Sequence, residues 1–215
     1  NAATAGLNST ANSANETDPG SVVAMYAGEM ATFSEAVTPS ANYTSSFECV
    51  ASAGAAAGGA FAKAVGDTYT MPSTPVDVVC TYTNTRKSTT LQLKKQWANA
   101  NVGDTASLTA TGITNSAGAA LSSTADTAGD LDSGAAVTVY AGEVATLGET
   151  VNPAANYTST GPVCTNTSGL SGSTLTVGAA DGPIVCTYTN TRKQGTLQVK
   201  KTWVNGKPGD AVTAT

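Results

Sequence analysis

Four cysteines are the residues whose types and spacing say most about the chemistry of this chain. They fall in two pairs at matched places in the sequence, Cys49 with Cys80 and Cys164 with Cys186. An even number of cysteines without Cys-x-x-Cys spacing, in a chain that has no histidine, favours disulfides over a zinc site. We predict one disulfide per pair, with free thiols as the alternative. Because disulfides persist in oxidising compartments, this predicts a periplasmic, cell-surface or secreted protein.

The segment "ADTAGDLDSG" gathers three acidic residues, Asp126, Asp130 and Asp132. Carboxylate oxygens at close spacing are ligands that calcium prefers. The spacing does not match an EF-hand loop, and the corresponding "ANETDPG" in the first half of the chain offers only Glu16 and Asp18. We therefore favour a solvated loop over a calcium site, and we predict no cofactor.

Composition excludes several classes of function. The absence of histidine rules out Ser-His and Cys-His catalysis, and no phosphate-binding loop is present, so we do not expect an enzyme. A net charge of −5 without a basic patch argues against a nucleic-acid partner. No apolar run reaches the roughly 18–20 residues of a transmembrane helix, so we expect no membrane span in this segment.

Self-similarity is the strongest pattern in the sequence. "VCTYTNTRK" occurs at Val79–Lys87 and again at Val185–Lys193, and Val22–Ser45 matches Ala136–Ser159. The segments "LQLKKQW" and "LQVKKTW" also correspond. A period of about one hundred residues is the size of one β-sandwich domain. The chain is therefore a tandem array.

Alternation of apolar and polar residues identifies the elements of each repeat. In "LQLKKQW", Leu91, Leu93, Lys95 and Trp97 share one face, which is typical of a half-buried strand. About seven such short strands, separated by Gly, Pro and Asn turns, predict an all-β fold of antiparallel Ig-like sandwich domains. One complete repeat spans residues 88–193. Residues 1–87 form a repeat that lacks its first strand, and residues 194–215 supply the first strands of a next one.

The order of these motifs resembles a known family. "LxLxKxW", then "YAGEVATLGETVNPAANYT", then a closing "CTYTNT" are similar to the collagen-adhesin B-type, or prealbumin-like, domains of large bacterial surface adhesins and pilin-like filament proteins. The resemblance covers nearly the whole chain, although the cysteine pair departs from the commonest Gram-positive members. It implies a stalk or filament of β-sandwiches at the bacterial surface. Many members carry a self-formed amide bond between a lysine on the first strand and an asparagine on the last, promoted by a glutamate.

The resemblance assigns two candidate amide-bond triads. They are Lys95, Glu149 and Asn190 in the complete repeat, and Lys201, Glu35 and Asn84 in the neighbouring unit. Alternation places all three members of the first triad on apolar faces, where unpaired polar groups are costly. The alternatives are ordinary roles: Lys95 reaching the sheet rim, Glu149 accepting backbone hydrogen bonds, and Asn190 capping the following turn.

The unmatched segments at the two ends raise a question of assembly. Leu197, Val199, Lys201 and Trp203 form a strand pattern that could complete residues 1–87 of another copy, giving a head-to-tail filament. The alternative is a window of a longer array, in which adjacent repeats are the partners. We expect a structural module of an extracellular filament or adhesin stalk. A loop-based glycan- or host-protein-binding module is the alternative function.

Overall fold

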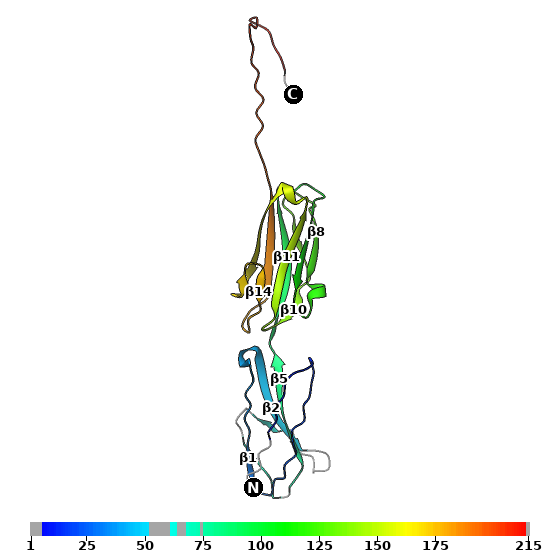
Figure 1. Ribbon diagram of the computed structural model, residues 1–215, viewed down its shortest axis with the longest axis vertical. Coiled ribbons are helices and arrows are strands. Elements are labelled where there is room, and N and C mark those ends of the chain that lie inside the picture. Colours follow the sequence, from blue (N-terminus) through cyan, green and yellow to red (C-terminus); the bar gives the residue numbers. More distant parts are fainter. Residues whose placement is uncertain (1–5, 52–60, 64–67, 74, 214–215) are drawn as a thin grey trace. The chain divides into compact units, whose positions relative to one another are not determined.

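The computed structural model describes residues 6–51, 61–63, 68–73 and 75–213. The chain divides into two compact units, unit 1 (Asn1–Lys87) and unit 2 (Ser88–Thr215). Within the described residues there are strands and three short 3-10 turns but no α-helix, which confirms the predicted all-β class (Figure 1).

One sheet of unit 2 contains both the first and the last strand of the repeat. Its strands follow the order β10-β6-β15-β12, and β9 pairs with β6 as well. Every pairing is antiparallel except that of β6 with β15, which run parallel over eight residue pairs from Leu91–Ile184 to Ala98–Thr191. The strands are β6 (Ser88–Ala98), β9 (Leu131–Ser133), β10 (Val137–Tyr140), β12 (Tyr157–Thr165) and β15 (Ile184–Arg192).

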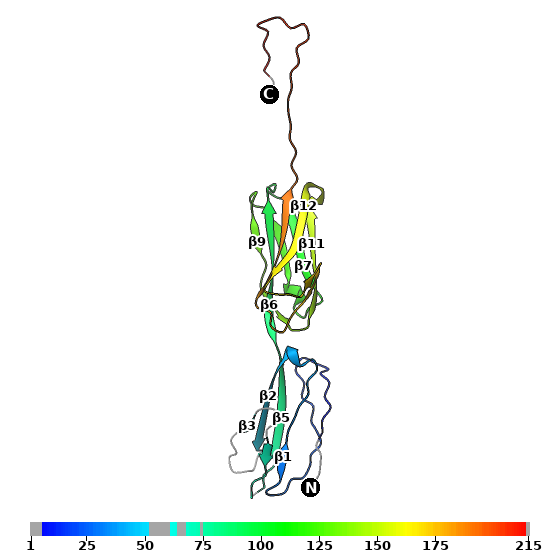
Figure 2. The ribbon, with the colours of Figure 1, turned by 90° about the vertical axis from the view of Figure 1, so that its left-hand side faces the viewer.

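The second sheet of unit 2 is antiparallel throughout. Its order is β13-β14-β11-β7-β8. The strands are β7 (Thr105–Thr111), β8 (Ala120–Thr124), β11 (Val144–Asn152), β13 (Leu170–Ser171) and β14 (Thr174–Thr176), and the 3-10 turns are η2 (Ser116–Gly118) and η3 (Ala154–Asn156). The two sheets form two layers (Figure 2), so each strand turns one face inward.

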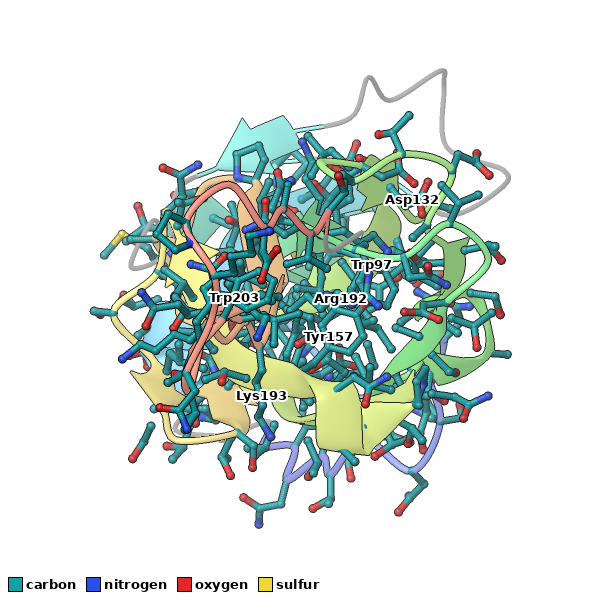
Figure 3. The ribbon with its side chains drawn as sticks, turned by 90° about the horizontal axis from the view of Figure 1, so that it is seen from above. Trp97, Asp132, Tyr157, Arg192, Lys193 and Trp203 are labelled. Carbon is teal, nitrogen blue, oxygen red and sulfur yellow. A yellow bond between two sulfur atoms is a disulfide. The ribbon has the colours of Figure 1, made fainter. Side chains whose placement is uncertain are left out.

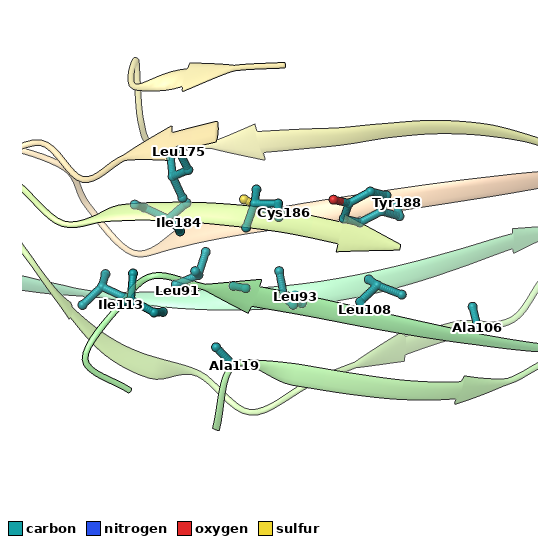
Figure 4. Packing of buried hydrophobic residues seen from close by; sticks show 14 of the residues in the cluster. Leu91, Leu93, Ala106, Leu108, Ile113, Ala119, Leu175, Ile184, Cys186 and Tyr188 are labelled. Carbon is teal, nitrogen blue, oxygen red and sulfur yellow. The ribbon is translucent and has the colours of Figure 1, made fainter. Parts of the chain in front are cut away.

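The core of unit 2 lies between these layers. Side chains from both sheets build one buried cluster, part of which is drawn in Figure 4. On β6 the buried positions alternate strictly through Leu91, Leu93, Lys95 and Trp97, which confirms the strand predicted for "LQLKKQW". The Trp97 ring meets the Tyr157 ring edge-on, with centroids 5.3 Å apart. Both residues are labelled in Figure 3. A lysine therefore occupies a core position among large apolar side chains.

The described part of unit 1 contains fewer strands than the repeat alignment predicts. One sheet has the order β3-β2-β5, with β2 (Tyr43–Ala51), β3 (Phe61–Lys63) and β5 (Val78–Arg86). A second sheet pairs β1 (Met30–Thr32) with β4 (Thr68–Thr70), and η1 (Ser40–Asn42) precedes β2. Residues 23–26 match β10 in sequence but form no strand. The reason is that β10 is held by β6, and the described part of unit 1 has no such neighbour.

Residues 194–213 form no strand, and each of them is exposed. Leu197 is 92% exposed, Val199 72% and Trp203 49%. A single extended segment gains no ladder hydrogen bonds, so the strand pattern that the sequence carries stays unused here.

Candidate functional site

Lys95 is the most unusual side chain of unit 2 because it is a fully buried cation. It lies on β6 with no exposed surface. Its Nζ is 3.4 Å from Glu149 Oε1, donates a 3.0 Å hydrogen bond to the carbonyl of Gln96 and lies 4.3 Å from the centroid of the Trp97 ring. The alternative role, in which Lys95 extends to the sheet rim, is therefore wrong.

Asn190 and Glu149 complete the cluster around this amine. Asn190 Nδ2 donates a 3.1 Å hydrogen bond to Glu149 Oε1, while Asn190 Oδ1 is buried without a partner. Asn190 is fully buried within β15, so it does not cap a turn. Glu149 comes from β11 in the opposite sheet. The structure thus brings together the three residues of the first predicted triad, each from a different strand.

Burial sets the electrostatics of this cluster. Removal from water lowers the pKa of Lys95 below its ordinary value, and the Glu149 carboxylate acts in the opposite direction. Burial, followed by the charge of Glu149, raises the pKa of Tyr188 to about 12. The Tyr188 hydroxyl is also buried without a hydrogen-bond partner. The surroundings of Lys95 therefore favour the neutral amine, which is the nucleophilic form, more than water does.

This arrangement has the groups that an acyl transfer from an amide requires. A neutral Lys95 Nζ can attack Asn190 Cγ, and Glu149 lies within reach of both side chains to carry protons between them. The two orientations of a carboxamide exchange its Nδ2 and Oδ1, so a protonated Glu149 can also donate to the carbonyl oxygen. Such a step needs no cofactor or metal.

Unit 1 contains the acid and the amide of the second triad. Asn84 Nδ2 donates a 2.7 Å hydrogen bond to Glu35 Oε1, and Ser45 Oγ donates to Asn84 Oδ1 at 2.5 Å. Glu35 Oε2 is buried without a partner. The structure does not bring Lys201 to this pair. Lys201 lies in the exposed segment, where its Nζ is 4.1 Å from the Trp203 ring centroid and donates to a backbone carbonyl.

Both predicted cysteine pairs are disulfide-bonded. Cys49 pairs with Cys80 across β2 and β5, and Cys164 with Cys186 across β12 and β15. In each case the two residues are directly opposite in the ladder, with Cα atoms 4.0 Å and 4.1 Å apart. The two disulfides indicate an oxidising environment for the folded chain.

The aspartates of the acidic segment at residues 125–134 accept local hydrogen bonds. Asp132 accepts a 2.6 Å hydrogen bond from Ser123 Oγ, which in turn accepts one of 2.8 Å from the indole nitrogen of Trp97. Asp130 accepts from the backbone N–H groups of Asp126 and Leu131. No group of three metal-ligating side chains with the geometry of an ion site occurs among the described residues.

Sequence reasoning missed two buried polar anchors. Ser123 is one, and nothing in its alternation distinguishes it from a core alanine. Glu143 is the other: it is buried and accepts hydrogen bonds from the backbone N–H groups of Thr114 and Tyr140, each 3.0 Å long. The "YAGE" turn that carries Glu143 recurs in unit 1, where Glu29 accepts from the N–H of Tyr26. The recurrence of this turn in both repeats could have identified Glu143 from the sequence.

Within the described residues, no helix has the length and apolarity needed to cross a membrane. Comparison of the chain with models of protein families, with curated proteins and with solved structures found no match to any of them.

Proposed function

We propose that this chain is a load-bearing repeat module of an extracellular bacterial filament or adhesin stalk, built from prealbumin-like sandwich domains. The observation that carries the proposal is the parallel pairing of β6 with β15 at the centre of one sheet. Because the two strands run parallel, the chain enters unit 2 at one end of this sheet and leaves it at the other. A pull on the two ends loads the β6–β15 ladder in shear, so that its hydrogen bonds are strained together.

Lys95 and Asn190 lie on the two strands of this ladder, Glu149 reaches them from β11 of the opposite sheet, and this arrangement supports the proposal. Lys95 is opposite Tyr188, two positions along the ladder from the Trp97–Asn190 pair. Condensation of Lys95 with Asn190 would join the first and last strands covalently. The Nζ–Cγ bond forms, the Cγ–Nδ2 bond breaks, and the nitrogen of Asn190 leaves as ammonia with one proton supplied from the neutral Lys95 amine through Glu149. Force applied at the ends would then pass through one covalent bond.

Intact-protein mass spectrometry tests the covalent clamp. Unit 2 of the full chain should be lighter by one ammonia than in the unmodified disulfide-bonded chain, and Asn190→Ala should not lose that ammonia. Lys94→Ala is the matched control, since Lys94 is a neighbour on the outward face and should leave the loss intact. A tryptic peptide that contains both Lys95 and Asn190 locates the bond. A wild-type mass equal to the unmodified chain refutes the clamp.

Head-to-tail assembly is the second part of the proposal. The exposed Leu197, Val199 and Trp203 have the alternation of β6 and would complete unit 1 of a neighbouring copy. Such a contact joins different surfaces on the two partners and therefore extends without closing. Electron microscopy of the purified full chain should show fibres with a regular axial repeat. A chain that remains a single particle at high concentration contradicts head-to-tail assembly.

A further inference from the structure

We infer that unit 1 is an acceptor for residues 197–203 of a second copy of this chain, and that Lys201 of that copy forms an amide bond with Asn84 under the control of Glu35. The inference rests on the proposed head-to-tail assembly and goes beyond it, since it makes the joint between copies covalent and assigns its acceptor, donor and proton carrier.

The open edge of β5 is the first observation. In unit 2 the matching strand β15 lies between β12 and β6, whereas in the described part of unit 1 β5 pairs only with β2. The inward positions of β15 are buried through Ile184, Cys186, Tyr188 and Asn190. The matching positions of β5 are only half-buried, and Asn84 is exposed. An unpaired strand edge with partly covered apolar side chains is a site for strand addition.

The acid and the amide are already in place beside that edge. Asn84 donates to Glu35 as Asn190 donates to Glu149, at 2.7 Å and 3.1 Å respectively. Glu35 Oε2 is buried and has no hydrogen-bond partner, and neither does the buried hydroxyl of Tyr82. In unit 2 the corresponding carboxylate has a lysine amine 3.4 Å away. The described part of unit 1 thus brings together two of the three groups of this chemistry, and a lysine amine is not among them.

The segment that carries such a cation matches β6 closely. "LQVKKTW" at residues 197–203 is identical to "LQLKKQW" of β6 at five of seven positions. The register of β6 on β15 then fixes the docked register on β5. It places Leu197 opposite Val78, Lys201 opposite Tyr82 and Trp203 opposite Asn84. In that register the amine of Lys201 takes the place beside Glu35 that Lys95 takes beside Glu149.

Tyr43 provides an independent anchor for the incoming segment. Its counterpart Tyr157 packs edge-on against Trp97 and donates a 2.5 Å hydrogen bond to Asp104. Asp104 follows Trp97 by seven residues, and Asp210 follows Trp203 by the same interval. Docking would therefore bring Trp203 and Asp210 to Tyr43. The match extends beyond the strand to the turn that follows it.

The reach of the segment favours a second copy over closure on the same chain. β6 and β15 are parallel, so the segment leaves unit 2 at the end away from Ser88, and the eleven residues of β6 span about 36 Å. Only three residues lie between Lys193 and Leu197, and the four steps from one to the other extend to about 14 Å. The segment is too short to run back along unit 2 to the end where unit 1 joins.

The reaction is balanced without an external reagent. The neutral Lys201 amine gives up one proton and bonds to Asn84 Cγ, the Cγ–Nδ2 bond breaks, and the former amide nitrogen leaves as ammonia. Glu35 accepts a proton from the amine and returns it to the leaving nitrogen. No oxidant or reductant is needed, because no atom changes oxidation state.

Two complementary variants test the inference. Lys201→Ala keeps the acceptor Asn84, and Asn84→Ala keeps the donor Lys201. Neither variant should form a polymer alone. A mixture of the two should give one covalent dimer that survives boiling in detergent with reductant. The wild-type chain should give a ladder, with one further ammonia lost per joint. Lys200→Ala, on the other face of the segment, is the matched control and should still give the ladder.

The possible failures are distinguishable. Fibres that dissolve into monomers in detergent overturn the covalent joint and leave head-to-tail assembly standing. Absence of both fibres and ladder overturns the inference together with the assembly. A wild-type monomer that has lost two ammonias, with Lys201 and Asn84 in one cross-linked peptide of a single chain, overturns the assignment to a second copy. Dimer formation from the mixed variants cannot arise from a folding defect in either one.

Discussion

Replacing Asn190 with alanine should convert unit 2 from a module that does not lengthen under force into one that unravels. In the wild-type chain, the proposed amide between Lys95 and Asn190 would close off nearly all of the residues between the two ends of the repeat. Force applied at Ser88 and Arg192 would then stretch only the few residues outside that closure. The variant keeps the strands and the disulfide but has no acyl group for Lys95 to attack.

The expected lengthening follows from the strand and disulfide positions. Unit 2 comprises 105 residues from Ser88 to Arg192, and the disulfide keeps the 22-residue interval between Cys164 and Cys186 closed. The remaining residues extend to about 300 Å at about 3.6 Å each. Subtracting the folded length of about 35 Å leaves an increment of about 260 Å. In the presence of reductant the increment should rise to about 340 Å.

Single-molecule pulling on the full chain measures these increments directly. We expect no unfolding event from wild-type unit 2, an event of about 260 Å from Asn190→Ala, and no change for Lys94→Ala relative to wild type. A wild-type event of about 260 Å would refute the clamp. If reductant does not lengthen the Asn190→Ala increment, the disulfide does not lie within the segment that the force extends.

Three further variants of unit 2 have expected outcomes. Replacing Cys164 and Cys186 together with alanine should lower the free energy of unfolding by about 3 kcal/mol, measured by urea titration, because a 22-residue closure is lost. Tyr188→Phe should leave stability unchanged or raise it by about 1 kcal/mol, since it removes a buried hydroxyl without a partner. In the wild type, the raised pKa of Tyr188 contributes stability that is complete below pH 10.0 and disappears as the pH rises through about 12, and Tyr188→Phe should abolish that loss. Ser123→Ala should cost about 1–3 kcal/mol because it leaves the indole N–H of Trp97 buried without an acceptor.

Each of these outcomes has a result that contradicts it. Equal unfolding free energies for the alanine pair and the wild type would mean that the disulfide does not restrict the unfolded chain. Marked destabilisation by Tyr188→Phe would show that its hydroxyl has a partner in solution. A neutral Ser123→Ala would show that another acceptor, such as Asp132, replaces the serine oxygen.

The sequence predicted best where a strand is defined by its own alternation. The buried face of β6 and the pairing of the cysteines both follow from spacing alone. Strands that depend on a neighbour were predicted less well. Residues 23–26 have the sequence of a strand, but they lack the partner that β6 provides to β10. Pairing partners far apart in sequence decide whether such a segment is ordered, and local pattern does not contain that information.

Prediction of the site shows the same division. Alternation placed Lys95, Glu149 and Asn190 on inward faces, and the resemblance to a known family grouped them. Their mutual distances depend on the packing of two sheets, which no local pattern contains. The Ser123–Trp97 and Glu143 hydrogen bonds were not predicted because a buried polar residue gives no periodic signal of its own.

The parallel pairing of β6 with β15 also governs when unit 2 can fold. Ile184 pairs with Leu91, which is 93 residues earlier in the chain, so the central ladder forms only after almost the whole repeat has been synthesised. Contacts at such separation slow folding, because a long loop must close before they are gained. Until then β6 can pair only with β9 and β10, and its other edge has no neighbouring strand. The last strand to leave the ribosome is therefore the one that completes the sheet, and a chain stopped before Ile184 would hold unit 2 with the edge of β6 unfilled.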